Sequence, residues 1–313
     1  MTGWLRRLIG ILIILTAVAV TLSRAPDRPV ETLVARWAPP PSEFIDVQGQ
    51  LVHLRDEGPR GDSLPIVLIH GTSASLHTWE GWVKALRPQR RVISFDLPGF
   101  GLTGPSANAD YRGDTYARFV LQLMDHLQVQ RFIVGGNSLG GEVAWRTAHR
   151  APERVERLIL VDALGLPFES SRMPVSWQVL QIPLLGRISE SLLPRPLVAQ
   201  DLVGVYGSPE GVSSELVDRY FELALREGNR RALAQRLAQW EPGADAALID
   251  TLKLPTLILW GGRDRLIPPP VAQEFQRRIA GSQLVMFERL GHVPQEEDPA
   301  ATVAPVLAFI KGR

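Results

Sequence analysis

The chain of 313 residues is long enough for one large α/β domain or two smaller ones. Hydrophobic residues make up 45% of it and charged residues 21%, as in an ordinary globular protein, and a net charge of +1 argues against a nucleic-acid partner. The absence of cysteine excludes disulfides, thiolate metal sites and a cysteine nucleophile. The composition leaves the oligomeric state open.

Residues 1–24 form a segment unlike the rest of the chain. After two arginines, residues 8–23 carry no charged side chain. A helix of this length spans about 24 Å, slightly less than a hydrocarbon core of about 30 Å, and it is apolar on every side, unlike a helix packed on a core. We expect residues 4–23 to form a transmembrane helix, either an uncleaved signal anchor or a cleaved signal peptide. The arginines before it favour a catalytic domain outside the cytoplasm, in the periplasm.

Residues 25–42 are rich in proline and predict a stiff tether between this helix and a compact domain. Two alternating segments follow, at 44–47 and 51–54, and they predict a hairpin at the edge of a sheet. The compact domain is therefore expected to begin at about residue 43.

Short apolar runs then recur between segments of helix length. This alternation predicts an α/β fold with a mostly parallel central sheet and helices on both faces. The runs are 65–69, 91–95, 131–135, 157–161, 255–260 and 284–287. Helical spacing is clearest at 115–127, with Asp114 as the expected N-cap, and after the expected cap Asp298, from Pro299 to about Lys311.

Residues 166–240 separate two of these strands by far more chain than a crossover needs. The segment is at first rich in leucine and proline and then has helical spacing from Ser214 to Trp240. We expect a helical cap, or lid, over the carboxyl ends of the strands, where open α/β sheets bind ligands. The α/β core would then comprise residues 43–165 and 241–313.

A serine between glycines follows the run at 131–135, in the sequence Gly136-Asn-Ser138-Leu-Gly140. Helical spacing begins directly after it, so Ser138 is expected at a strand-to-helix turn. This is the pattern of a nucleophile elbow, in which small neighbours permit the sharp turn that presents the hydroxyl. The motif alone also fits a tightly packed turn or a phosphate loop, so a nucleophile has to be supported by other residues.

Two such residues follow later strands. Asp264 comes after the run at 255–260 and His292 after the run at 284–287, so both are expected at the same edge of the sheet as Ser138. A serine hydroxyl needs a base with a pKa near 7, and an imidazole held by a carboxylate supplies one. Asp162, which also follows a strand, is an alternative partner for the histidine.

Backbone donors for an oxyanion are expected from two turns. His70-Gly71-Thr72 directly follows the run at 65–69, where the Thr72 N–H can point at the serine. The Leu139 N–H of the elbow would be the second donor of an oxyanion hole.

Together these motifs resemble those of the α/β-hydrolase superfamily, in its cap-bearing branch. The resemblance implies an α/β-hydrolase fold in which Ser138 is the nucleophile, His292 the base and Asp264 the acid, with no cofactor. The resemblance covers roughly residues 44–312. The motifs that carry it are His70-Gly71, Asp96–Gly101, Gly136–Gly141, Gly262–Asp264 and Gly291-His292.

Other polar and aromatic residues have simpler expected roles. His70 and Asp96 are expected to shape their own loops, and His77 to pack or to line a pocket. Trp79 and Trp177 are candidates for substrate binding. No ligand spacing typical of a metal site occurs among the histidines, so no metal is expected.

The expected function is hydrolysis of a small-molecule ester with an apolar acyl or alcohol group, as in a carboxylesterase or lipase. One alternative is a carbon–carbon hydrolase of ring-fission diketones, whose elbow is similar to Gly136–Gly141, although Thr72–Ser75 replaces the usual Gly-Pro-Gly. Another is a non-catalytic ligand-binding protein of the same fold. Ser138 disfavours relatives that use an elbow aspartate, such as epoxide hydrolases and haloalkane dehalogenases.

Overall fold

The computed structural model describes residues 3–182 and 190–311, and its centre is an eight-stranded sheet in the order β1-β2-β4-β3-β5-β6-β7-β8. β2 is antiparallel to both of its neighbours, and the remaining neighbours are parallel. The predicted edge hairpin and mostly parallel sheet are therefore confirmed. The strands are β1 (Glu43–Val47), β2 (Gln50–Glu57), β3 (Ile66–Ile69), β4 (Val92–Phe95), β5 (Phe132–Asn137), β6 (Val155–Val161), β7 (Thr256–Gly261) and β8 (Gln283–Phe287).

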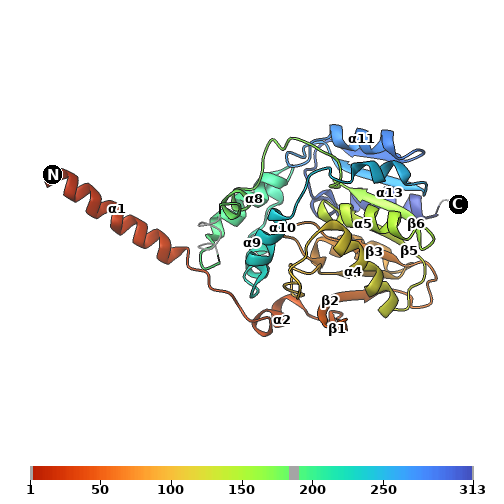
Figure 1. Cartoon of the computed structure of the whole chain (residues 1–313), viewed down its shortest axis with the longest axis horizontal. Coiled ribbons are helices and arrows are strands. Elements are labelled where there is room, and N and C mark those ends of the chain that lie inside the picture. Colours follow the sequence, from red (N-terminus) through yellow and green to blue (C-terminus); the bar gives the residue numbers. More distant parts are fainter. Residues whose placement is uncertain (1–2, 183–189, 312–313) are drawn as a thin grey trace.

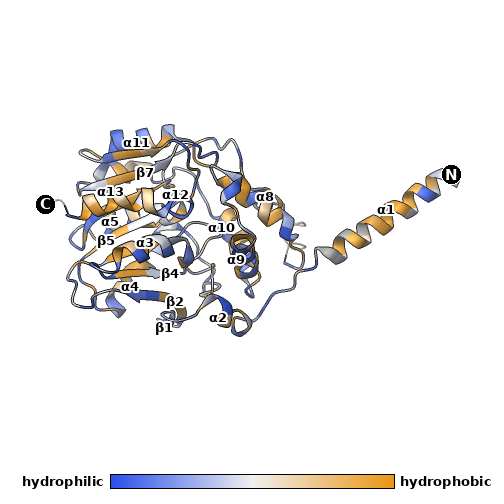
Figure 2. Ribbon diagram, turned by 180° about the vertical axis from the view of Figure 1, so that it is seen from behind, coloured by the Kyte–Doolittle hydropathy of each residue, from blue (hydrophilic) through white to orange (hydrophobic). Residues whose placement is uncertain are grey.

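Helices cover both faces of this sheet, which explains why its central strands are uninterrupted apolar runs. In β3, Val67 and Ile69 pack into the core on one face, whereas Ile66 and Leu68 pack into the core on the other. Figures 1 and 2 show these two faces from opposite sides. The first face carries α4 (Gly113–His126), α5 (Leu139–Arg150) and α11 (Pro270–Arg278), and the second carries α3 (Glu80–Leu86) and α13 (Pro299–Lys311).

Of the two predicted helix caps, the one at α13 is confirmed and the one at α4 is wrong. At α13, Asp298 accepts a hydrogen bond from the Ala301 N–H at 2.9 Å, as predicted. At α4 the prediction is wrong, because the helix begins at Gly113 and Asp114 already lies inside its first turn. Asp114 instead pairs with arginines of α4 and α5, where its charge is compensated by neighbouring side chains rather than by the helix end.

The inserted segment is a helical cap beside the carboxyl ends of the strands (Figure 1). The expected helix from 214 to 240 is divided into two helices, and Gly228 between them has a φ of 82°, which a glycine adopts without strain. Residues 183–189 of the expected cap lie outside the described residues. The cap helices are α6 (Val175–Leu180), α8 (Arg195–Val205), α9 (Ser214–Ala224) and α10 (Asn229–Ala238), with a short 3₁₀ turn, η2 (Pro209–Gly211).

The predicted tether at residues 25–42 is wrong. Its middle forms α2 (Glu31–Trp37), which packs on α9 of the cap. The Trp37 ring is buried and its Nε1–H donates to Glu222 at 2.7 Å, while Arg36 donates to the same carboxylate at 2.8 Å. These contacts hold the segment against the domain, an outcome that proline content alone could not reveal.

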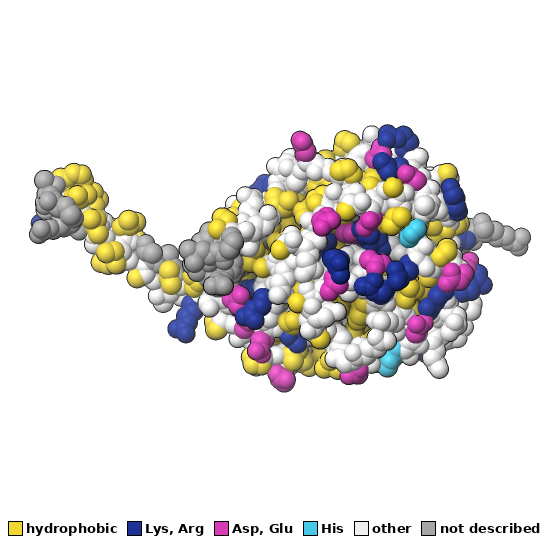
Figure 3. Space-filling model, viewed as in Figure 1, with side chains coloured by type: hydrophobic (Ala, Val, Ile, Leu, Met, Phe, Trp, Pro, Cys, Tyr) yellow, Lys and Arg dark blue, Asp and Glu magenta, His cyan; other side chains and the backbone are white. Residues whose placement is uncertain are grey.

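The N-terminal helix α1 (Gly3–Leu22) projects from the cap side of the domain and carries its apolar side chains into solvent (Figure 3). Leu12 and Ile14 are each 64% exposed. The predicted N-terminal hydrophobic helix is thus confirmed as an element. In the part of the chain that the structure describes, however, no helix has the length and apolar character needed to cross a membrane, so the transmembrane interpretation of residues 4–23 is unsupported.

A buried histidine links α2 to the core and makes stability depend on pH. The His77 ring lies in η1 (Leu76–Trp79), and its Nε2 is 2.8 Å from the carbonyl oxygen of Trp37. Burial lowers the pKa of His77 to about 4. Between this value and the ordinary pKa of about 6.5, the unfolded chain binds a proton that the folded chain does not.

We therefore expect the free energy of unfolding to be highest above about pH 6.5 and to fall as the pH falls toward 4. Urea unfolding at several pH values measures this slope. His77→Gln, which keeps a donor but cannot titrate, should flatten it, whereas the control His149→Gln on α5 should not. Equal slopes in all three proteins would contradict the prediction.

Candidate active site

Ser138 lies in a sharp turn between the end of β5 and the start of α5. Its φ is 55° and its ψ is −117°, a conformation that non-glycine residues rarely adopt. A Cβ at position 136 would lie 2.0 Å from the carbonyl oxygen of Gly140, and one at position 140 would lie 2.0 Å from that of Ile69. The two glycines are thus required by close backbone approach, as the sequence pattern predicted.

His292 and Asp264 meet at the same edge of the sheet. His292 Nδ1 lies 2.7 Å from Asp264 Oδ2, and both side chains are buried. The other carboxylate oxygen, Oδ1, accepts the Leu266 N–H at 2.8 Å and the Ile267 N–H at 2.9 Å. An acceptor at Nδ1 places the ring proton there and leaves Nε2 as the nitrogen that can accept a proton.

Asp162 lies beside this pair at the end of β6. One oxygen each of Asp162 and Asp264 and a ring nitrogen of His292 lie within 4.8 Å of one another, close enough for a shared cation. Nδ1 of the histidine, however, already bonds to Asp264, and Asp162 Oδ1 accepts the Gly261 N–H at 2.9 Å. Of the two candidate acids, Asp264 is the one that contacts His292.

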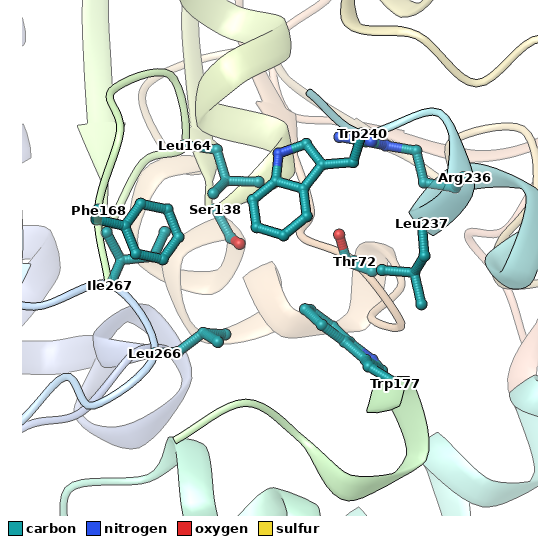
Figure 4. A pocket seen from close by; sticks show the side chains of 10 residues that line it. All are labelled: Thr72, Ser138, Leu164, Phe168, Trp177, Arg236, Leu237, Trp240, Leu266 and Ile267. Carbon is teal, nitrogen blue, oxygen red and sulfur yellow. The ribbon is translucent and has the colours of Figure 1, made fainter. Parts of the chain in front are cut away.

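The expected oxyanion donors belong to two turns, since Leu139 directly follows Ser138 at the start of α5 and Thr72 follows β3. Thr72 and Ser138 line one cavity, and Figure 4 shows both hydroxyls facing into it. Within the described chain, neither the Thr72 nor the Leu139 N–H donates a hydrogen bond. Unpaired N–H groups beside a nucleophile are the feature that an oxyanion hole requires.

His70 holds the loop of Thr72, as expected. Its Nε2 accepts the Leu97 N–H at 2.9 Å, and its Nδ1 is 2.7 Å from the carbonyl oxygen of Gly71. Burial lowers the pKa of His70, so the neutral ring that these two contacts need is favoured. Asp96 likewise accepts the Leu76 and Leu102 N–H groups, at 2.7 and 2.8 Å, and so shapes its own loop as predicted.

A larger apolar cavity of about 350 Å³ continues from Thr72 beneath the cap helices. Trp177 of α6 lies between it and the smaller cavity at Ser138, and its Nε1–H donates to Ser73 Oγ at 3.2 Å. The structure thus places Trp177 beside the nucleophile. The walls of the large cavity include Val179, Leu180, Leu193, Leu197, Leu202 and Leu233.

The structure places Trp79 away from these cavities. The Trp79 side chain is fully buried and packs on Trp82, with ring centroids 5.0 Å apart, in the core on the α3–α13 face. The expectation that it binds substrate is therefore wrong, because its 3₁₀ turn points the indole into the core. His77, for which packing and pocket lining were both open, packs against α2.

Two residues that sequence reasoning missed hold the loop of His292. Asn137 Nδ2–H donates to the carbonyl oxygen of His292 at 2.9 Å. Glu297, in α12 (Pro294–Glu297), accepts the Gly291 N–H at 2.7 Å and, from the cap, the Gly207 N–H at 2.8 Å. Gly207 is 90 residues from Glu297 in the chain, so no local pattern could identify this contact.

Comparison with known proteins shows the family to which the chain belongs. The chain matches the family model of the α/β hydrolase fold over residues 65–299. It is 30% identical to 2-hydroxy-6-oxo-2,4-heptadienoate hydrolase of Pseudomonas putida, with 80% of this chain and 90% of that protein covered, and 28% identical to Lipase 1 of Psychrobacter immobilis, with 78% and 76% covered. A solved membrane phospholipase A is similar over 98% of each chain, with a TM-score of 0.71 and 26% identity.

The two hydrogen bonds that Glu297 accepts from Gly291 and Gly207 lead to a prediction. Glu297→Ala leaves two backbone N–H groups without their acceptor, which should lower the free energy of unfolding by about 1–3 kcal/mol. Because a small displacement of the His292 loop misplaces the imidazole, we expect hydrolytic activity to fall by about 10- to 100-fold. Urea unfolding and ester turnover measure the two effects. Glu288→Ala, which removes an exposed glutamate of the same loop, is the matched control and should change neither.

Proposed function

The chain belongs to the α/β-hydrolase family, and we propose that it is a serine hydrolase that cleaves esters of an apolar acyl or alcohol group. The observation that carries this proposal is the buried 2.7 Å contact between His292 and Asp264, in a loop that is bonded to Asn137, the residue before Ser138 in the strained turn. A histidine that only stabilises the fold does not require a serine turn bonded to its loop. A serine that only stabilises the fold does not require a strained backbone. The combination favours an enzyme over a ligand-binding protein of the same fold.

In the proposed reaction, Ser138 Oγ attacks the ester carbonyl carbon while His292 Nε2 takes the hydroxyl proton. The carbonyl oxygen becomes negatively charged, and the Thr72 and Leu139 N–H groups donate to it. Collapse of this intermediate breaks the bond to the alcohol, which leaves with the proton from His292. Water then attacks the acyl-enzyme while His292 again takes a proton. Collapse of this second intermediate breaks the bond to Ser138 Oγ, which regains the proton from His292, and the carboxylic acid is released.

The chemical character of the cavities supports an apolar substrate. Apolar side chains dominate both cavities, mainly leucine and aromatic residues at Ser138 and leucine and valine beneath the cap, which suits an acyl chain of a lipid-like ester. Trp177, which lies between the two cavities, is proposed to contact the substrate next to its carbonyl group. The similarity to a lipase and to a membrane phospholipase A is consistent with this choice.

The carbon–carbon hydrolase alternative has less support from the site. The substrate named for the Pseudomonas putida relative, a heptadienoate, is a carboxylate anion, and a buried anion needs an available cation. Arg236 lines the cavity at Ser138, and its charge is paired with Glu142 at 3.3 Å, although its Nε–H has no partner among the described residues. An uncharged ester makes no such demand.

We also propose that α1 attaches the protein to a membrane surface. Its end is joined to the cap by two backbone hydrogen bonds of 2.9 Å, from the Leu193 N–H to Ser23 and from the Ala25 N–H to Ser191. An apolar helix bound to lipid would therefore bring the cap, and the cavity beneath it, to the membrane surface. An extracytoplasmic position of the catalytic domain stays a prediction.

The catalytic assignment can be tested with a fluorophosphonate probe, which reacts with activated serines. We expect the full chain to be labelled and Ser138→Ala not to be, while the control Ser282→Ala retains labelling. Asp264→Asn should lower turnover of p-nitrophenyl esters by about 10⁴-fold without unfolding the protein. Labelling that survives Ser138→Ala would contradict the assignment, and turnover of a ring-fission diketone but of no ester would favour the alternative chemistry.

Membrane attachment is tested by sedimentation of the full chain with phospholipid vesicles. The double variant Leu12→Glu/Ile14→Glu puts charges on nearly opposite sides of α1, at two positions that are each 64% exposed. Each charge costs about 2–3 kcal/mol in lipid, so the bound fraction should fall at least tenfold. Leu51→Glu, at a residue of β2 that is 52% exposed, is the control and should bind as the wild type does. Equal binding of both variants would exclude α1 as the attachment site.

A further inference from the structure

The carboxyl group of Asp162 has no role in the reaction described above, although it lies against the reacting groups. One oxygen, Oδ1, accepts the Gly261 N–H, whereas Oδ2 is buried and has no hydrogen-bond partner among the described residues. The side chain is fully buried at the end of β6, next to Asp264. A buried polar atom without a partner is costly, so it calls for an explanation.

The backbone of Asp162 has an unusual conformation and is hydrogen-bonded to a neighbouring strand. Its φ of 43° is unusual for a residue with a side chain, and its N–H donates to the carbonyl oxygen of Leu259 at 3.0 Å. Two residues later, the Leu164 N–H donates to the carbonyl oxygen of Ser138 at 2.9 Å. The turn that carries Asp162 is therefore bonded both to β7 and to the nucleophile turn.

Charge makes two adjacent ionised carboxylates unfavourable at this place. Asp264 is already the acceptor for His292 and for two backbone N–H groups, so each of its carboxylate oxygens has a donor. Glu297 is a further acidic group that acts on Asp162, and His292 is the basic group within reach. Like-charged carboxyls this close share a proton rather than both ionising.

We propose, on the basis of the function proposed above, that Asp162 is a positioning residue that stays protonated and offers its Oδ2–H to the Asp264 carboxylate. The proton gives the unpartnered oxygen a donor role and leaves one negative charge in the pair. Asp264 then remains ionised and aimed at His292 Nδ1, while Asp162 itself touches neither substrate nor the serine oxygen. Burial, followed by the negative charge of Asp264, raises the pKa of Asp162 well above its ordinary value, which agrees with this arrangement.

Two variants distinguish a protonated Asp162 that donates a hydrogen bond from an ionised Asp162. Asp162→Asn keeps the shape, an N–H donor for Asp264 and an acceptor for Gly261, but has no proton to lose. Asp162→Ala removes both contacts. We expect ester turnover of the full-length Asp162→Asn protein to stay within about threefold of the wild type, and that of Asp162→Ala to fall by about tenfold or more, mainly in kcat. Equal losses in both variants would overturn the proposal.

A second measurement does not depend on activity, so it keeps the proposal testable if the chain proves to be a different kind of hydrolase or if Asp162→Ala does not fold. If the pKa of an acid is raised in the folded state, the free energy of unfolding falls as the pH rises. Above about pH 4 the unfolded chain ionises this acid, whereas the folded chain does not. The Tm of Asp162→Asn relative to the wild type should therefore rise as the pH is raised from 4 to 8. A relative Tm that is constant or falls over this range would show that Asp162 is ionised in the folded protein and would exclude the proposed proton.

Failure of the two proposals can be told apart. If Ser138 is not labelled by the fluorophosphonate but the relative Tm rises with pH, the proton is present and the reaction has been assigned wrongly. If Ser138 is labelled and the relative Tm does not rise, the serine chemistry stands and Asp162 has another role.

Discussion

The hydrogen bond between His292 and Asp264 is the interaction on which the candidate site depends, because it fixes the imidazole at the edge of the sheet where β5 ends in the turn of Ser138. It exists only because parallel strands end at one edge, so residues that follow β5, β7 and β8 meet there. The buried ends of these strands exclude water, which strengthens the contact. The sheet thus supplies both the meeting point and the environment.

The cap is part of this arrangement rather than a separate cover. The His292 N–H donates to the carbonyl oxygen of Val205 at 2.7 Å, where α8 ends, and Glu297 binds Gly207 close by. On the other side, Trp177 of the cap contacts the loop of Thr72. Parts of the cap that border the apolar cavity are therefore bonded both to the loop of His292 and to the loop of Thr72.

The same connections extend to the N-terminal segment. Residues 23–25 pair with residues 191–193 of the cap, and α2 packs on α9 through Trp37. The segment that the sequence predicted as a stiff tether is instead held against the cap by these contacts. An apolar helix joined to the cap in this way gives a physical reason for placing the cavity near a lipid surface.

By itself, the sequence determined the alternation of strands and helices, the insertion of a cap and the nucleophile turn, because apolar periodicity and glycines at positions 136 and 140 reflect local geometry. It also ordered Ser138, Asp264 and His292 along the chain, since each follows an apolar run. Only the tertiary structure decided that Asp264 rather than Asp162 contacts His292, that Trp79 belongs to the core, and that Glu297 joins the cap to the base. Those outcomes depend on contacts between residues far apart in the chain, whose side chains a periodic pattern cannot orient.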